Sequence, residues 1–354
     1  METKKIFKSL VLLSIIILLA SCKSAIYEVA YPALSDGRYD SEFPYKSSSD
    51  QLEQITNSVK MLNCVAYYTS YVFAYDSMIR KKDLNEEMFK EKSIEIGRFD
   101  KTASGTATIL SADKGSVVLL TCAHIVDFPD TVISYYRTPS GYNSGYVESI
   151  SIKNKQVNYI PEFPDGGEVD ILVKNDHIDL ALLGRHYGIK NSQKFEVFEY
   201  PIGKAKELAW GSFVYAIGFP MNYKMLSKGI VSSPNKDRSG SFLIDAVFNK
   251  GFSGGIVLAI RDGVPNFELV GLVNSVPIMR QFVLTPKNPD RRRIYNPIVP
   301  YQGEAYLQEM MNIRYGVTKV ISIETIMEFI QRNWKDMLKE GYNLTDFYDK
   351  IKIK

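Results

Sequence analysis

The chain has 354 residues, of which 45% are hydrophobic, so it can bury a sizeable core in one large or two moderate domains. Its formal net charge is only +3, and Lys4, Lys5 and Lys8 fall within the first 21 residues. The remainder is close to neutral, which gives no support for a nucleic-acid partner.

Residues 1–21 have the form of a signal peptide for export. The three lysines precede an apolar run over residues 10–20, which is too short to span a bilayer. The run leads into Leu19-Ala20-Ser21-Cys22, which resembles the lipobox of bacterial lipoproteins, where the cysteine carries lipid and becomes the mature N-terminus. This resemblance implies a protein exported to the bacterial cell envelope and held by lipid on Cys22 to a membrane, with the outer membrane as the expected one, facing the periplasm or the surface. The alternative is an ordinary secretory signal with an incidental cysteine.

Residues 22–50 are predicted to form a tether, because they are rich in Tyr, Ser and Pro and have little periodicity. From Val59 onward, short runs rich in Val, Ile, Tyr and Thr alternate with Gly, Asp, Asn and Pro, which indicates β-strands separated by turns. The predicted strands are residues 59–73, 104–111, 116–121, 147–152, 195–197, 213–218, 229–232, 242–246, 255–260, 268–274 and 317–321.

Helical patterns are confined to two places. After Ser322, apolar residues recur at helical spacing up to Trp334, which predicts a C-terminal helix. Residues 83–93 are predicted to form a shorter helix, with Asp83 as N-cap and Glu86 three residues later. Because no alternation of strands and helices is present, the pattern favours an all-β sandwich or a pair of barrels.

Residues 285–314 are predicted to be a polar insertion whose Arg291, Arg292 and Arg293 lie at a solvated loop tip, with a basic patch for anionic lipid or polymer as the alternative. Cys64 and Cys122 are the only thiols outside the signal region, and we expect two small buried apolar side chains rather than a disulfide. The three histidines show no metal-ligand spacing, so neither a metal nor another cofactor is expected.

The stretch Gly251-Phe252-Ser253-Gly254-Gly255 fits two unrelated serine-nucleophile patterns, G-x-S-x-G of α/β-hydrolases and G-x-S-G-G of chymotrypsin-like proteases. In the first pattern the acid and the histidine follow the serine along the chain. His124, His177 and His186 all precede Ser253, so that arrangement has no base. The residues after Ser253 also read as an apolar strand rather than a helix, which excludes the hydrolase elbow.

The order His, Asp, Ser fits the second pattern, and each member stands in a fitting local sequence. Thr121-Cys122-Ala123-His124 resembles T-A-A-H, and Asp179-Leu180-Ala181-Leu182-Leu183 resembles D-[IL]-A-[LV]-[LIV]. Gly105-Thr106-Ala107 and Ala216-Ile217-Gly218-Phe219-Pro220 add G-[TS]-[AG] and A-I-G-[YF]-P. The chain therefore resembles the trypsin/chymotrypsin-like serine proteases over most of residues 59–335, closest to the peptidase domain of the bacterial HtrA class, without a PDZ domain.

The resemblance implies an all-β, chymotrypsin-like fold of two antiparallel six-stranded barrels with a C-terminal helix. The first barrel would occupy residues 51–195 and carry His124 and Asp179; the second would occupy 196–321 and carry Ser253, with the helix and tail in 322–354. By the same resemblance His124 is the general base, Asp179 orients it, and Ser253 attacks a polypeptide substrate to form an acyl-enzyme. The N–H groups of Gly251 and Ser253 would form the oxyanion hole.

Substrate-binding residues follow only by position in the family. Val247 would lie at the base of the primary pocket, and Asn274, Ser275 and Val276 along its edge, which implies a small or medium aliphatic P1 residue. Phe252 stands where the family has Asp or Asn. It therefore supports a competing hypothesis, a catalytically silent lipoprotein that binds a peptide or an envelope protein. Nothing in the sequence indicates an oligomeric state.

Overall fold

A computed structural model of the chain describes residues 35–44, 46–138, 141–187, 194–234, 240–246, 249–275, 278–286, 298, 303–313 and 316–349. The signal peptide with Cys22, the pocket residues Val247 and Val276, and the arginine run 291–293 lie outside the described residues.

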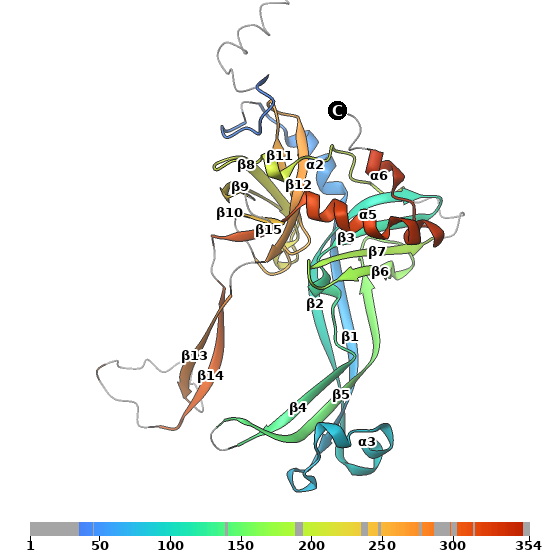
Figure 1. Cartoon of the computed structure of the whole chain (residues 1–354), viewed down its shortest axis with the longest axis vertical. Coiled ribbons are helices and arrows are strands. Elements are labelled where there is room, and N and C mark those ends of the chain that lie inside the picture. The colour runs from blue at the N-terminus through green and yellow to red at the C-terminus, as the bar shows by residue number, and fades with distance from the viewer. Residues whose placement is uncertain are drawn as a thin grey trace, which may run out of the picture.

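The first half of the chain forms a seven-stranded antiparallel sheet with the order β4-β5-β1-β2-β3-β7-β6 (Figure 1). Its strands are β1 (Val59–Phe73), β2 (Ser93–Asp113), β3 (Ser116–Thr121), β4 (Thr131–Arg137), β5 (Asn143–Tyr159), β6 (Asp170–Asn175) and β7 (Leu180–His186). The sheet curls without closing. The outer halves of β1 and β5 run on together with β2 and β4 as a long arm.

The second half forms a closed barrel in the order β10-β15-β12-β11-β8-β9. Its strands are β8 (Phe213–Gly218), β9 (Met225–Ser233), β10 (Ser241–Ile244), β11 (Ile256–Ile260), β12 (Phe267–Ser275) and β15 (Thr318–Ser322). The hairpin of β13 (Ile278–Pro286) and β14 (Ala305–Ile313) lies between β12 and β15 in the chain and forms a sheet of its own. The predicted chymotrypsin-like, all-β fold is therefore confirmed, and the second half is the expected six-stranded barrel. The first half differs from the expected six-stranded barrel, because it is a sheet of seven strands that curls without closing.

The described ranges also contain five α-helices. They are α2 (Ser49–Asn57), α3 (Glu86–Lys92), α4 (Ala123–Val126), α5 (Ile323–Lys339) and α6 (Thr345–Asp349). The C-terminal helix was predicted where α5 lies, and Ser322 caps it by accepting from the Thr325 N–H. No helix in the described ranges is both long and apolar enough to cross a bilayer.

Two local predictions were wrong. Residues 195–197 form no strand; Phe195 instead packs its ring against Phe163 and Tyr187, with ring centroids 4.9 Å and 5.3 Å away. The N-cap of α3 is Asn85, which accepts from the Met88 N–H at 2.9 Å, rather than Asp83. Asp83 accepts from the Arg80 N–H in the preceding turn. Short apolar runs and closely spaced cap residues are ambiguous until tertiary contacts decide between them.

Both halves contribute to one continuous hydrophobic core, and a smaller core in the arm joins Phe73, Ile79, Met88, Phe89, Val147 and Ile150. The Cys64 and Cys122 side chains are buried free thiols, as expected from their apolar surroundings. The smaller core explains the length of the arm, because α3 and the ends of β1 and β5 bury apolar side chains there.

The segment 35–44, within the range predicted as a tether, packs on the second barrel. The Tyr39 hydroxyl donates to Glu268 Oε2 at 2.7 Å, and the Arg261 guanidinium lies 4.0 Å from the centre of the Tyr39 ring. The Asp40 N–H donates to the Ile260 carbonyl, and the Asp40 carbonyl accepts from the Phe213 N–H. This part of the N-terminal region is therefore an integral piece of the barrel surface.

Candidate active site

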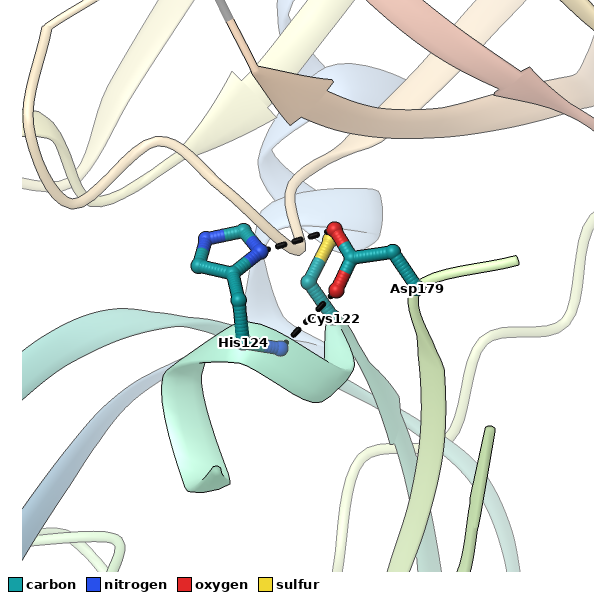
Figure 2. A group of neighbouring side chains, drawn as sticks. All are labelled: Cys122, His124 and Asp179. Atoms are coloured by element: carbon teal, nitrogen blue, oxygen red, sulfur yellow. Dashed lines mark hydrogen bonds and ion pairs between the residues drawn. The ribbon is translucent and has the colours of Figure 1, made fainter. Parts of the chain in front are cut away.

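His124 is placed by the end of a fully buried strand. β3 stops at Thr121, and the single turn of α4 carries the histidine directly after it. The His124 N–H donates to Asp179 Oδ1 at 2.8 Å, and His124 Nδ1 lies 2.7 Å from Asp179 Oδ2 (Figure 2). The imidazole side chain is 48% exposed, so a substrate can reach it.

Asp179 immediately precedes β7 and has a left-handed backbone, with φ of 57°. This conformation is uncommon outside glycine but is most accessible to Asp and Asn. The two contacts from His124 use both carboxylate oxygens, which fixes the ring and leaves Nε2 as the uncommitted nitrogen.

Asn274 links this pair to the second barrel. Its Nδ2 donates to Asp179 Oδ2 at 2.9 Å, while its backbone carbonyl accepts from the Ser253 hydroxyl at 2.9 Å. His124, Asp179, Asn274 and Ser253 therefore form one chain of hydrogen bonds. Within the described residues, no hydrogen bond joins Ser253 Oγ directly to His124.

The sequence assigned Asn274 to the pocket edge and missed its contact with the carboxylate. Position on a strand does not show which residue across the interface a side chain will meet. In the sequence, the only indication of this contact was the position of Asn274 on the strand expected to face the cleft. Ser275 lies at the end of β12, where its backbone pairs with Lys319 of β15.

In the loop of residues 249–253, which ends at the serine, every backbone carbonyl accepts a hydrogen bond. The five acceptors lie in residues 249–253, so the loop cannot rotate a peptide without breaking a bond. The donors are the Phe252 N–H to Asn249 (3.0 Å), the Met221 N–H to Lys250 (2.8 Å), the Thr106 hydroxyl to Gly251 (2.9 Å), the Gly255 N–H to Phe252 (3.0 Å) and the Thr106 N–H to Ser253 (2.8 Å).

Among the described residues, the Phe252 N–H donates within this loop, whereas the N–H groups of Gly251 and Ser253 have no hydrogen-bond partner, as is also true of Asn249 and Lys250. Gly251 has φ of 97°, and a Cβ there would lie 2.5 Å from the Phe219 carbonyl oxygen, so only glycine fits. The N–H groups of Gly251 and Ser253 are the two donors that the family resemblance assigns to an oxyanion hole. Their availability is what such a site requires.

Phe252 does not face the cleft. Its side chain is 1% exposed and belongs to the common core, where its ring occupies the space that a Cβ on Gly218 would take. The residue that departs from the family pattern therefore anchors the loop by burial. A buried Phe ring contributes on the order of 2 kcal/mol or more to holding the loop in place.

Thr106 connects the two halves at this loop. It is wholly buried on β2, and its hydroxyl both donates to the Gly251 carbonyl and accepts from the Phe219 N–H at 2.9 Å. Its carbonyl accepts from the Thr121 hydroxyl at 2.7 Å, on the strand that leads to His124. One residue thus joins the histidine strand to the serine loop.

Cys122, His124 and Asp179 lie close enough to offer three metal ligands, but their chemistry does not fit a metal site. The Cys122 thiol is fully buried and donates to the Val273 carbonyl, and burial, with the nearby Asp179 charge, raises its pKa well above the usual value. A metal binds the thiolate, which this environment disfavours. The histidine and the carboxylate are also committed to each other.

Part of the chain matches a known protein family. Residues 105–272 match the family model described as "Trypsin-like peptidase domain". Among solved structures, the serine endoprotease from Yersinia pestis is similar at 17% identity, covering 85% of this chain and 70% of that one, with a TM-score of 0.38. Deg5 is similar at 15% identity, covering 65% and 88%, with a TM-score of 0.33. Both TM-scores lie below 0.5, so these two structures carry no argument about function. A search of curated proteins gives no match.

Replacing Thr106 by Val should destabilise the protein by about 2–5 kcal/mol, because the Gly251 carbonyl and the Phe219 N–H lose their partner in a buried place. Thr106→Ser keeps the hydroxyl and loses one methyl group, at a cost of about 1 kcal/mol. Urea unfolding of the three proteins measures the difference. Equal stability of the Val and Ser variants would contradict the role given to the hydroxyl.

Proposed function

We propose that this chain is a serine endopeptidase that works through Ser253 as nucleophile, His124 as general base and Asp179 as the group that orients the base. The match of residues 105–272 to the family model of a trypsin-like peptidase domain supports the reaction class. The observation that carries this assignment is the single chain of hydrogen bonds from His124 through Asp179 and Asn274 to Ser253. The N–H groups of Gly251 and Ser253, which have no partner among the described residues, support it.

Acylation starts with rotation of the Ser253 hydroxyl away from the Asn274 carbonyl and toward His124 Nε2. The imidazole takes the hydroxyl proton as Oγ attacks the scissile carbonyl, and Asp179 stabilises the imidazolium through Nδ1. The Gly251 and Ser253 N–H groups receive the developing oxyanion, and each such donor contributes roughly 3 kcal/mol to transition-state stabilisation.

The tetrahedral intermediate then collapses as His124 gives its proton to the leaving amine, and the C–N bond breaks. Water attacks the acyl-enzyme in the second half, with His124 again taking the proton and returning it to Ser253 Oγ. The peptide bond is thereby hydrolysed and the serine regenerated. The competing hypothesis of a silent binding module rested on Phe252, and its burial removes that residue from the cleft.

A fluorophosphonate probe should label the native protein covalently and should fail to label Ser253→Ala, because the probe reacts only with an activated serine. The substitution should also lower kcat for an ester substrate by a factor on the order of 10⁶. Mass spectrometry of the labelled peptide identifies the site. A well-folded native protein that takes up no label would favour the binding module instead.

We extend the proposal to specificity: Val247 at the base of the pocket and Val276 at its edge, together with Asn274 and Ser275, favour a small or medium aliphatic P1 residue. A peptide library digested with the native protein should give cleavage after Val, Ala or Leu. Cleavage predominantly after Lys or Arg would refute this part, since Val247 offers no charge to a basic side chain.

The proposal also includes attachment to a membrane of the bacterial cell envelope through lipid on Cys22, as the lipobox resemblance implies. Cells fed a clickable fatty acid should incorporate it into the native protein and not into Cys22→Ser, and the variant should move from the membrane fraction to the soluble one. Equal labelling of both proteins would exclude Cys22 as the attachment site.

A further inference from the structure

The turn between β8 and β9 has an unusual backbone. Met221 and Asn222, in the short turn Pro220–Asn222, are consecutive non-glycine residues with φ of 52° and 65°. Such left-handed residues cost on the order of 1 kcal/mol each and persist where the surroundings impose them, often at functional sites. The Met221 side chain is 57% exposed, so packing of that side chain does not account for the conformation.

The turn contacts the loop of residues 249–253 that carries Ser253. The Met221 N–H donates to the Lys250 carbonyl at 2.8 Å, and the Phe219 carbonyl oxygen lies against Gly251, 2.5 Å from where a Cβ would stand. The Asn222 N–H donates back to the Phe219 carbonyl at 3.2 Å. The turn therefore contacts the loop at two adjacent residues, with the Met221 N–H at the Lys250 carbonyl and the Phe219 carbonyl at Gly251.

The ends of the turn are fixed by the barrel, because Gly218 of β8 pairs with Met225 of β9. With both ends held, the chain can place the Pro220–Met221 peptide against Lys250 only if it reverses sharply within the few residues between. The left-handed angles at Met221 and Asn222 supply that reversal. A residue that resists positive φ would shift the peptide that carries the Met221 N–H.

Peptide planarity transmits this contact to the site. In a trans peptide the carbonyl and the N–H point in opposite directions. The Lys250 carbonyl points at Met221, so the N–H of Gly251, in the same peptide unit, points away from the turn. Gly251 has no side chain to resist a rotation of that peptide, which would turn the N–H away and bring the carbonyl oxygen into its place.

We propose that Met221 is a positioning residue: through its backbone N–H, the turn of residues 219–222 holds the Gly251 N–H in the orientation in which it donates to the oxyanion. The inference rests on the proposed peptidase function and adds to it a second element, distant in sequence, on which the oxyanion hole depends. The strain at Met221 and Asn222 is then the cost of keeping the site ready before substrate binds.

The test compares two substitutions that remove the same exposed side chain. Met221→Val introduces a β-branched residue, which is an outlier at positive φ, whereas Met221→Gly adopts that backbone freely. Tyr223→Val is the matched control, because Tyr223 directly follows the turn, is 69% exposed and has an extended backbone with φ of −102° that suits valine. All four proteins are assayed on a short peptide ester, with thermal unfolding as a check of folding.

Met221→Val should lower kcat by about 10²-fold with KM little changed, as expected for loss of one oxyanion donor. It should weaken binding of a peptide aldehyde, whose adduct carries an oxyanion, by a similar factor and leave binding of the product peptide unchanged. Met221→Gly should recover most of kcat, and Tyr223→Val should match the native protein. If Met221→Val does not fold, Asn222→Val tests the same turn.

Native kcat in a folded Met221→Val or Asn222→Val variant would overturn the inference and leave the proposed function standing. Equal losses in Met221→Val and Tyr223→Val, or a rise in KM alone, would also overturn it, since a merely structural role predicts those results. If the native protein neither hydrolyses the ester nor takes up a fluorophosphonate, the proposed function fails and the inference falls with it.

Discussion

The arrangement of the site depends on one buried contact, the pair of hydrogen bonds that Thr106 of β2 makes to the carbonyls of Gly251 and Ser253. The histidine and the aspartate come from the curled sheet, and the serine comes from the closed barrel. A site divided in this way works only if the curled sheet and the closed barrel keep a fixed position relative to each other. Since Thr106 is wholly buried, breaking either bond would leave a polar group without water or a partner. The free-energy cost of that loss keeps the two halves in place.

Glycines permit that close approach. Gly254 has φ of 82° and lies against the Thr106 carbonyl, Gly218 leaves room for the Phe252 ring, and Gly105 leaves room for Ile125 of α4. Any side chain at these three positions would push the halves apart or displace the histidine turn. The motif glycines therefore have a packing role that is separate from chemistry, and the protein holds its serine loop from three directions: by Thr106, by the buried Phe252 ring and by the 219–222 turn.

The sequence predicted the parts of the fold with strong local patterns. The bounds of β1, β3 and β8 agree with the predicted strands, because continuous apolar or alternating runs there end at clear turn residues. It also identified His124, Asp179 and Ser253 as candidates from their order. It did not predict the contact of Asn274 with Asp179, the support of Gly251 by Met221, or the long arm of β1, β2, β4 and β5. Each of these depends on residues far apart in the chain. A backbone hydrogen bond can also form with almost any residue type, so the sequence does not indicate it.

The most direct test of this account is a crystal structure of the protein after reaction with a fluorophosphonate. The account predicts a phosphorus atom bonded to Ser253 Oγ, with the phosphonyl oxygen accepting from the Gly251 and Ser253 N–H groups at roughly 2.7–3.1 Å. The Lys250 carbonyl should still accept from the Met221 N–H in that adduct. A phosphonyl oxygen directed away from both N–H groups, or a Lys250 carbonyl turned toward it, would contradict the account.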